Sequence, residues 1–415
     1  MDIVETLKEL CTASKKAGRQ LALSSLDQRN AVLKNIASNL KAQSEAIITA
    51  NEEDLDAAVK SGLSEAMCDR LKLTQARIDG IAAAMEKLIA LPDPLGISSG
   101  WRRPNGLYIS KETVPLGTVG IIYEARPNVT VDAAALCIKS GNCAVLRGGK
   151  EAYNTNLALE AAIKEALSAA GLSPDCVSLI HDVTRESSLQ LMKLSGYIDV
   201  LIPRGSASLI QSVVQNSTVP VIETGAGNCH VYIDRYADPE LAKKIAVSAK
   251  ISRPSVCNAE EKLLIHKDIA KTLLPDITAE LKKNGVTVKG DEKVCELVDA
   301  IPATEEDLRK EYNDYVITVY CVDSVDAAIE HINAYNTGHS EAIITKDEAT
   351  AEKFLSGVDA AVVYLNASTR FTDGEEFGFG AEIGISTQKL HARGPCGLNE
   401  LTTCKYKIRG NGQIR

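Results

Sequence analysis

One cysteine of this chain lies in a sequence environment that suits chemistry better than packing. The chain has 11 cysteines, and Cys257 stands in a polar loop, directly before Asn258 and shortly before an apolar run. A free cysteine is most often a small buried hydrophobe. Four others fit that description, because they lie within or beside apolar patterns: Cys137, Cys143, Cys176 and Cys321. Cys257 is therefore the candidate nucleophile for thiol chemistry.

A carboxylate and two glycines precede this loop. Glu223 follows a predicted strand over 219–222, and Gly225 and Gly227 come directly after it. Gly225-Ala-Gly227 looks like the start of a dinucleotide fingerprint, but position 230 is His and a strand follows where the motif needs a helix. We predict instead a flexible, close-packed turn that lets Glu223 and the backbone approach a substrate.

Arginines and hydroxyls are candidates for anion binding. Ser368, Thr369, Arg370 and Asp373 place hydroxyls, one cation and one acid in a single predicted loop, which suits an amino acid zwitterion. Arginine pairs bidentately with phosphate or carboxylate. A solvated surface loop is the alternative interpretation. Other arginines in loops or turn-like segments are Arg126, Arg204, Arg253 and Arg393.

Two loops after predicted strands could hold phosphate groups. Gly205 and Ser206 open a predicted helix, whose free amides suit a pyrophosphate. An ordinary serine N-cap at Ser206 is the alternative, and the two roles are compatible. Arg147 and Lys150 lie at the C-terminal end of a predicted parallel strand, where ligands bind in such sheets. From the residues alone, a solvated basic cluster is the preferred interpretation of this pair.

Two strand–helix alternations must position these residues. The first 95 residues predict helices, because apolar residues recur at helical spacing. Short apolar runs alternate with helical segments from residue 117, and again from near residue 229. This pattern predicts parallel sheets covered on both faces. The sequence therefore predicts two α/β domains with the reacting centre between them, a usual place for a ligand.

Composition excludes several classes of function. The chain has 415 residues and a net charge of −9, which argues against a nucleic-acid partner. It has no apolar run of the ~20 residues that span a bilayer and no signal-peptide pattern at its N-terminus. The scattered cysteines and histidines show neither a disulfide framework nor metal-ligand spacing. We expect a cytoplasmic enzyme without a metal or membrane partner.

Several short motifs of the sequence resemble those of the aldehyde dehydrogenase superfamily, and within it those of the branch that reduces γ-glutamyl phosphate. A carboxylate at a strand end, two glycines and then a loop cysteine is the arrangement of that superfamily. The motifs that resemble this branch are Tyr123-Glu-Ala-Arg-Pro-Asn128, Leu146-Arg-Gly-Gly-Lys150, Asn366-Ala-Ser-Thr-Arg-Phe-Thr-Asp-Gly374, Phe377-Gly-Phe-Gly-Ala-Glu-Ile-Gly384 and His391-Ala-Arg-Gly-Pro395. The resemblance covers nearly the whole chain.

The resemblance implies an aldehyde dehydrogenase-like α/β fold with two parallel-sheet domains and a small oligomerisation arm. Residues 1–98 and 117–224, with part of 385–397, would form the cofactor domain. Residues 225–384 would form the catalytic domain, and 99–116 with 398–415 the arm. The implied assembly is a homodimer or homotetramer.

The implied reaction is the NADPH-dependent reduction of L-glutamyl 5-phosphate to L-glutamate 5-semialdehyde and phosphate, the second step of proline synthesis from glutamate. It would proceed through a thioester on Cys257. Lys150 replaces the glutamate that accepts the ribose hydroxyls in NAD-preferring members, and a lysine can pair with a 2′-phosphate. The resemblance therefore implies NADP(H) as the cofactor.

The implied site residues fall into three groups. The catalytic group is Cys257, Asn128 and Glu223, with Asn128 or Arg126 as the side-chain donor to the oxyanion. The cofactor group is Arg147, Lys150, Gly205, Ser206 and Glu311, the last also readable as part of a charged, solvated face. The substrate group is Arg126, Ser255, Ser368, Thr369 and Arg370.

Two other functions stay open at this point. One is a general NADP-dependent aldehyde dehydrogenase, and the other is a catalytically silent oligomeric scaffold. Phosphate dependence distinguishes the first from the acyl phosphate reductase, and rapid labelling of a single thiol would exclude the second. Glutamate 5-kinase, which would supply the labile substrate, is the candidate protein partner.

Overall fold

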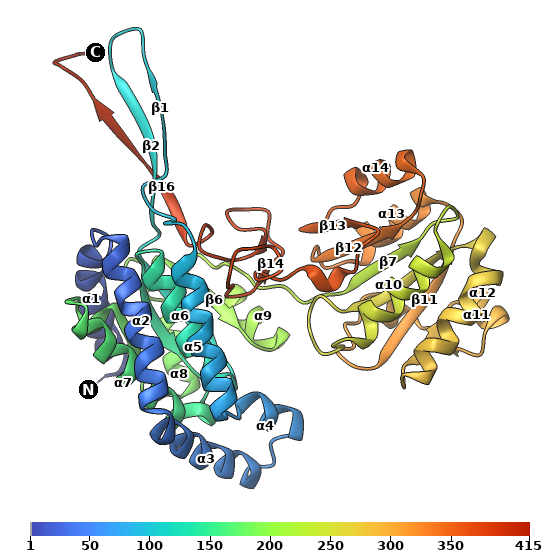
Figure 1. Ribbon diagram of the computed structural model, residues 1–415, viewed down its shortest axis with the longest axis horizontal. Helices are drawn as coiled ribbons and strands as arrows, with labels where there is room; N and C mark the ends of the chain where they lie inside the picture. Colours follow the sequence, from blue (N-terminus) through green and yellow to red (C-terminus); the bar gives the residue numbers. More distant parts are fainter. Residues whose placement is uncertain (1) are drawn as a thin grey trace. The chain divides into compact units, whose positions relative to one another are not determined.

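The structure is a computed structural model that describes residues 2–415, apart from the side chains of residues 65 and 66. Met1, where the predicted cofactor domain begins, lies outside the described residues. The chain divides into two compact units (Figure 1). The first unit is Met1–Thr224, Gly378–Gly384 and Cys396–Arg415, and the second is Gly225–Phe377 and Ile385–Pro395.

This division differs from the predicted domain boundaries near the C-terminus. Residues 378–384 were expected in the catalytic domain, and part of 385–397 in the cofactor domain; of the latter range, residues 396 and 397 do lie in the first unit. Ile385–Pro395 instead belongs to the second unit, where Ile385 O accepts the Gly225 N–H at 3.0 Å. Gly384 belongs to the first unit, where its carbonyl accepts the Cys396 N–H at 2.8 Å. Backbone hydrogen bonds therefore place residues 378–384 in the first unit and residues 385–395 in the second.

The first unit is built on a four-stranded parallel sheet in the order β5-β4-β3-β6. Its strands are mainly apolar and almost completely buried, as expected for a sheet covered on both faces. The strands are β3 (Thr118–Tyr123), β4 (Cys143–Arg147), β5 (Val177–Leu179) and β6 (Val200–Arg204). The helices after them are α6 (Pro127–Lys139), α7 (Tyr153–Ala169), α8 (Arg185–Leu191) and α9 (Ala207–Asn216).

The strand predicted over 219–222 is wrong. Only an isolated bridge between Val221 and Leu201 forms there. Pro220 has no N–H to donate to a ladder, which limits the pairing. Glu223 therefore follows a single bridge, not a strand.

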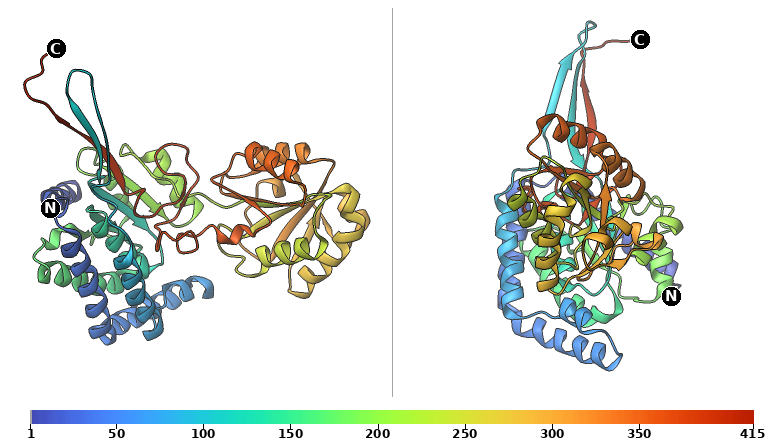
Figure 2. Two further views of the ribbon diagram at one scale, coloured as in Figure 1. Left: turned by 45° about the horizontal axis from the view of Figure 1, so that its top comes forward. Right: turned by 90° about the vertical axis from the view of Figure 1, so that its right-hand side faces the viewer.

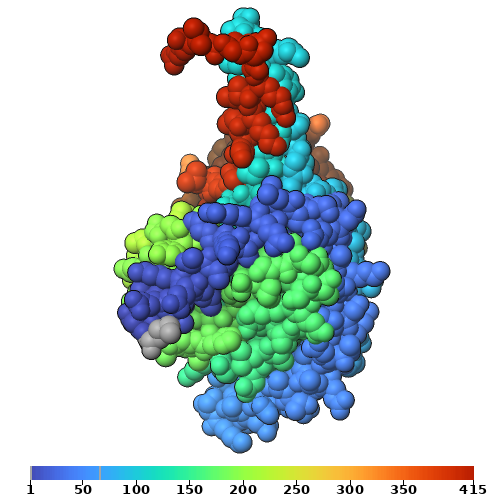
Figure 3. Space-filling view, turned by 90° about the vertical axis from the view of Figure 1, so that its left-hand side faces the viewer, coloured from blue at the N-terminus to red at the C-terminus, as the bar shows by residue number. Residues whose placement is uncertain are grey.

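The predicted N-terminal helices are confirmed. Their apolar faces recur at helical spacing, and Asp2, Ser25, Ser64 and Thr74 cap four of them. Side-chain amides of Asn39 and Gln28 donate to carbonyls of α7 and of the residue after it at 3.0 Å, so α2 lies along α7. In Figure 3 the N-terminal segments, in blue, border the green part of the first unit. The helices are α1 (Ile3–Leu21), α2 (Leu26–Ala42), α3 (Ser44–Lys60), α4 (Glu65–Leu71) and α5 (Gln75–Ala90).

The segments predicted to form an oligomerisation arm pair as a three-stranded antiparallel sheet of β1 (Ser98–Arg102), β2 (Tyr108–Pro115) and β16 (Thr402–Arg409). Their role in assembly stays a prediction. Figure 2 shows this sheet extending beyond the helices of the first unit. Tyr406 and Ile408 are 57% and 61% exposed. Exposed apolar side chains beside the unpaired edges of β1 and β16 are typical of a surface that another chain covers.

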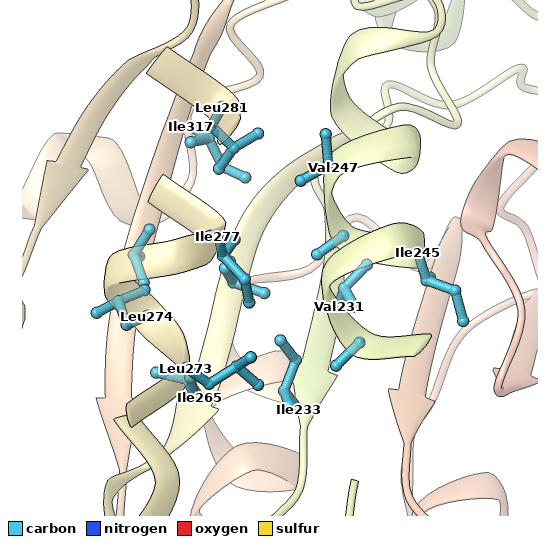
Figure 4. Close-up of a cluster of buried hydrophobic side chains, with 14 of the residues drawn as sticks. Val231, Ile233, Ile245, Val247, Ile265, Leu273, Leu274, Ile277, Leu281 and Ile317 are labelled. Carbon is cyan, nitrogen blue, oxygen red and sulfur yellow. The ribbon is translucent and has the colours of Figure 1, made fainter. Parts of the chain in front are cut away.

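The second unit has a seven-stranded parallel sheet in the order β10-β9-β11-β8-β7-β12-β13. Aliphatic side chains alternate on the two faces, and Figure 4 shows the larger core beneath α10 and α11. The strands are β7 (Cys229–Ile233), β8 (Glu260–His266), β9 (Thr287–Gly290), β10 (Ile301–Pro302), β11 (Val316–Val322), β12 (Ser340–Ile344) and β13 (Val362–Leu365). The helices are α10 (Pro239–Ile251), α11 (Lys267–Lys283), α12 (Glu292–Leu297), α13 (Val325–Tyr335) and α14 (Glu348–Gly357).

Candidate active site

In the second unit, Cys257 lies in the short loop that joins α10 to β8. Pro254 in this loop is buried and the Ala259 N–H donates to Val256 O at 3.0 Å, so the loop is a compact turn. Cys257 is half-buried and Ser255 is exposed. Of the four cysteines predicted to be packing residues, three are buried, whereas Cys321 is partly exposed.

A glycine fixes the backbone of Cys257. A Cβ atom added to Gly227 would lie 1.4 Å from the Cys257 carbonyl oxygen, so no larger residue fits there. The Gly227 N–H donates to Glu311 Oε1 at 2.8 Å. The predicted close packing of the glycine turn is confirmed, and Glu311 is held against this turn instead of forming part of a solvated face.

Asn258, the next residue, joins the cysteine loop to the loop that begins at Ser368. Its Nδ2 donates to the carbonyl oxygens of Arg370 at 3.2 Å and Thr372 at 2.9 Å. The Thr369 hydroxyl donates to Asn258 O at 2.7 Å. Thr369 is fully buried, so its predicted contact with substrate does not fit this position, and its observed role is to hold the two loops together. Ser368 accepts the Arg370 N–H at 3.3 Å and is 9% exposed.

Arg370 brings a cation close to Cys257. Its Nε donates to Ser252 Oγ at 3.1 Å and its Nη1 donates to Asn258 Oδ1. Burial lowers the pKa of the Arg370 guanidinium, the neighbouring Arg253 lowers it further, and Cys257 and Asp373 raise it. Among the ion pairs within residues 2–415, none involves either arginine. The positive charge near the thiol is therefore available to an anion.

A buried carboxylate, Asp307, fixes the segment that precedes Glu311. Asp307 is 2% exposed and accepts hydrogen bonds from Lys289 Nζ at 2.6 Å, Tyr312 OH at 2.7 Å and the Thr304 N–H at 2.8 Å. Burial alone would raise its pKa, but the hydrogen bonds from Lys289, Thr304 and Tyr312 outweigh it. The pKa of Asp307 therefore lies well below its usual range.

In the first unit, the predicted cofactor residues Arg147, Lys150, Gly205 and Ser206 lie at or just beyond the C-terminal ends of β4 and β6. β3 is paired with both β4 and β6, so the loops after these strands meet where the strands end. The Ser206 N–H donates to Glu124 Oε2 at 2.8 Å, and the Ala125 N–H donates to Glu151 Oε1 at 2.6 Å. Two carboxylates thus tie the loops together, and Ala125 adopts a positive φ of 40° between them.

The basic pair splits into two roles. Arg147 is 8% exposed and donates to the carbonyls of Gly148 at 2.9 Å and Thr184 at 2.7 Å, so it fixes the loop, and burial lowers its pKa. Lys150 is exposed and has no hydrogen bond or ion pair to another described residue. Lys150 therefore fits the charge of a phosphate, whereas Arg147 is already bound.

The helix that Ser206 opens shows an ordinary N-cap. Ser206 Oγ accepts the Leu209 N–H at 3.4 Å, as the alternative interpretation predicted. Gly205 packs against Glu124, since a Cβ there would lie 2.5 Å from its Oε2. The Ser206 amide expected to bind a pyrophosphate thus has an internal carboxylate as its partner.

Asn128 lies in the first turn of α6, and Arg126 precedes that helix with non-helical angles (φ −142°, ψ 81°), as its position before Pro127 predicted. Asn128 Nδ2 donates to Asp132 Oδ2 at 3.0 Å, which orients the amide. Burial raises the pKa of Asp132 to about 6, against the effects of Asn128 and Arg204. Glu223 is half-buried in the same unit.

Sequence analysis did not identify Glu124, Glu151, Asp132 or Asn258. Glu124 lies inside the motif 123–128 and Asn258 directly follows Cys257, so the sequence position of each could have identified it as a candidate. Glu151 and Asp132 had none, because their roles depend on which loops the fold brings together. Among the described residues there is no cluster of His, Cys, Asp and Glu that could hold a metal ion, and no helix long and apolar enough to cross a membrane.

A family model described as the aldehyde dehydrogenase family matches residues 4–315 and 296–406. The chain belongs to the aldehyde dehydrogenase family. A γ-glutamyl phosphate reductase of Clostridium beijerinckii is 57% identical over 97% of this chain and 98% of its own. One of Caldicellulosiruptor bescii is 54% identical over 100% of this chain and 99% of its own.

Solved structures agree with this family assignment. The crystal structure of γ-glutamyl phosphate reductase from Thermotoga maritima is similar with a TM-score of 0.96 and 47% identity, covering 98% of this chain and 99% of that one. An acetylating aldehyde dehydrogenase from Geobacillus thermoglucosidasius shares the fold with a TM-score of 0.70 at 17% identity, over 100% of this chain and 98% of its own. The predicted aldehyde dehydrogenase-like α/β fold is confirmed.

We predict that Asp307→Asn lowers the free energy of unfolding by about 2–3 kcal/mol at pH 7, because charge-assisted hydrogen bonds are lost. Since the folded pKa of Asp307 is depressed, its stabilisation is present above the unfolded pKa of about 4 and is lost as pH falls below it. Urea unfolding at pH 7 and pH 3 checks both points.

The control is Asp276→Asn, which removes the same charge from an exposed site on α11. It should change stability by less than about 0.5 kcal/mol. Equal effects of the two substitutions at pH 7 would contradict the assigned role of Asp307.

Proposed function

We propose that this chain is a γ-glutamyl phosphate reductase, which converts L-glutamyl 5-phosphate to L-glutamate 5-semialdehyde and phosphate in proline synthesis. The observation that carries the proposal is the half-buried Cys257 near Arg370 and Arg253, two arginines that form no direct ion pair with a carboxylate of the described residues. A thiol beside unneutralised cations suits an anionic acyl donor, because arginine binds phosphate and carboxylate. The full-length relatives with this name support the same substrate.

The residues near Cys257 account for the first half-reaction. The Cys257 thiolate attacks the acyl carbon, the C–O bond to phosphate breaks, and phosphate leaves with that electron pair to give a thioester. Arg253 and Arg370 stabilise the negative charge that moves onto the phosphate. Ser255, exposed in the same loop, remains a predicted contact for the substrate.

A nicotinamide cofactor, which the aldehyde dehydrogenase family and the reductase name imply, supplies the hydride that reduces the thioester to the aldehyde. The residues of the first unit fit such a group, since the exposed Lys150 ammonium group could pair with a phosphate of the cofactor. NADP(H) is our more specific proposal, because Lys150 would pair with the 2′-phosphate. Gly205 and Ser206 would lie nearest the pyrophosphate.

The roles of Asn128, Arg126 and Glu223 remain predictions. All three belong to the first unit and Cys257 to the second. Asn128 or Arg126 would donate to the oxyanion, and Glu223 would orient the thiol or carry a proton to the tetrahedral thiohemiacetal, since hydrolysis would waste the activated substrate. The cytoplasmic location, glutamate 5-kinase as a partner and Glu311 as a ribose ligand also remain predictions.

The experiment that tests the proposal is the reverse reaction, NADP+ reduction by L-glutamate 5-semialdehyde, with and without phosphate. Turnover should require phosphate stoichiometrically, because phosphate is the acyl acceptor. Equal rates without phosphate would favour a general NADP-dependent aldehyde dehydrogenase. Failure of iodoacetamide to label Cys257 rapidly would favour the catalytically silent scaffold.

We predict that Cys257→Ala lowers kcat to below about a thousandth of the wild-type value, because the covalent step is lost. NADPH binding, measured by fluorescence titration, should be unchanged. Cys321→Ala, at a partly exposed cysteine on β11, is the control and should retain activity. A larger residual rate in Cys257→Ala would reject the nucleophile.

We predict that Lys150→Glu lowers kcat/KM for NADPH by about 10²-fold and for NADH by much less, because a cation paired with the 2′-phosphate is replaced by an anion. Steady-state kinetics with the two cofactors measures the difference. Lys193→Glu changes an exposed lysine of the same unit and serves as the control. Equal losses with both cofactors would show that Lys150 does not contact that phosphate.

We propose that β1, β2 and β16 hold a homodimer or homotetramer, since a sheet edge can add a strand from another chain. Deleting residues 398–415 removes β16 and should give a monomer by light scattering at micromolar concentration. Tyr406→Ser with Ile408→Ser, which alters only exposed side chains of β16, should weaken the assembly without removing the strand. An unchanged oligomer in both variants contradicts the role of the arm.

A further inference from the structure

A second thiol lies directly behind the candidate nucleophile. Cys229 begins β7, is fully buried, and its Sγ donates to the Cys257 carbonyl oxygen at 3.2 Å. This is the same oxygen against which Gly227 packs. The backbone of Cys257 is thus held by a steric contact and by a hydrogen bond from one buried thiol.

A chain of hydrogen-bonded hydroxyls ends at His339, the second possible acceptor of the Cys229 proton. Tyr364 OH lies 2.8 Å from Thr372 Oγ1, Thr372 Oγ1 lies 2.6 Å from Ser340 Oγ, and Ser340 Oγ lies 2.8 Å from His339 Nδ1. Burial raises the pKa of Tyr364 to about 12, so its phenol keeps a proton to donate. If each hydroxyl donates to the next group, Ser340 supplies the proton to His339 Nδ1.

This direction of the chain leaves one acceptor for the thiol. Cys229 Sγ lies 3.8 Å from His339 Nδ1, the other acceptor within reach. Because the Cys257 carbonyl lies nearer to Cys229 Sγ, at 3.2 Å, and Ser340 Oγ lies 2.8 Å from His339 Nδ1, we assign the single S–H proton of Cys229 to the Cys257 carbonyl. Burial, with Glu341 and Cys257 nearby, raises the pKa of the Cys229 thiol, which therefore stays protonated and able to donate.

We propose that Cys229 is a positioning residue for the reductase reaction: its S–H orients the peptide that carries Cys257, and the hydroxyl chain from Tyr364 to His339 keeps that proton in place. The inference rests on the proposed role of Cys257 as nucleophile. A small displacement of a reacting atom costs up to about 10²-fold in rate, so one hydrogen bond behind the loop is enough to matter.

The test compares Cys229→Ala, which removes the donor, with Cys229→Ser, which retains one. Cys229→Ala should lower kcat of the phosphate-dependent reverse reaction at least about tenfold, change the KM for phosphate little, and shift the pH profile of iodoacetamide alkylation at Cys257. Cys229→Ser should recover kcat to within about threefold of wild type. Peptide mass spectrometry identifies the alkylated thiol.

The matched control is Val231→Ala, two residues along β7. Val231 is fully buried on the apolar face of the sheet, so this change destabilises the same strand without touching the Cys257 loop. It should lower the melting temperature but leave kcat and the alkylation profile unchanged. Ser340→Ala, which lets His339 compete for the Cys229 proton, should give a loss smaller than that of Cys229→Ala.

Three results would overturn the inference. They are wild-type kcat and alkylation in Cys229→Ala, a Cys229→Ser variant as slow as Cys229→Ala at an unchanged melting temperature, and a loss in Val231→Ala equal to that in Cys229→Ala. A Ser340→Ala variant identical to wild type would overturn the hydroxyl chain. Turnover in Cys257→Ala would instead overturn the proposed function, so the two failures are distinguishable.

Discussion

The contact between Gly227 and the Cys257 carbonyl is the constraint on which the second unit's site depends. There is no room for a side chain between them. The Gly227 N–H and the Cys257 carbonyl are both hydrogen-bonded, to Glu311 and Cys229 respectively, so two loops and the start of β7 are fixed at one point. Arg370 and Asn258 extend this arrangement outward, because each uses its side chain to bind the other's loop.

The first unit uses two half-buried carboxylates for a similar purpose. Glu124 accepts the Ser206 amide and Glu151 accepts the Ala125 amide, so the loops after β3, β4 and β6 are tied to one another. Both carboxylates also act on Arg147, where each raises the pKa of the guanidinium against the effect of burial. Arg147 donates to two carbonyls, so its charge and its hydrogen bonds are both used within the protein.

The features of the fold and the site that could be predicted from the sequence are those that depend on neighbouring residues in the chain. The fold class followed from apolar runs alternating with helical segments, and Cys257 and the glycines stood out by their neighbours in the chain. Thr369 and Arg147 were expected to touch ligands, yet each bonds a backbone carbonyl, which residue type alone does not reveal. The predicted strand over 219–222 does not form because Pro220 lacks an N–H. The assignment of 378–384 to the first unit and of 385–395 to the second depends on backbone pairing between distant segments.

The arm joins segments that the ribosome makes far apart in time. β2 ends at Pro115, and its partner β16 begins only at Thr402. Translation of the residues between them takes roughly 15 to 60 s at typical rates. During that interval the edge of β2 that β16 later covers has open N–H and C=O groups, which pair readily with other strands. Its central residues are Ser110, Lys111, Glu112 and Thr113, polar side chains that keep a newly made strand soluble while it waits for its partner.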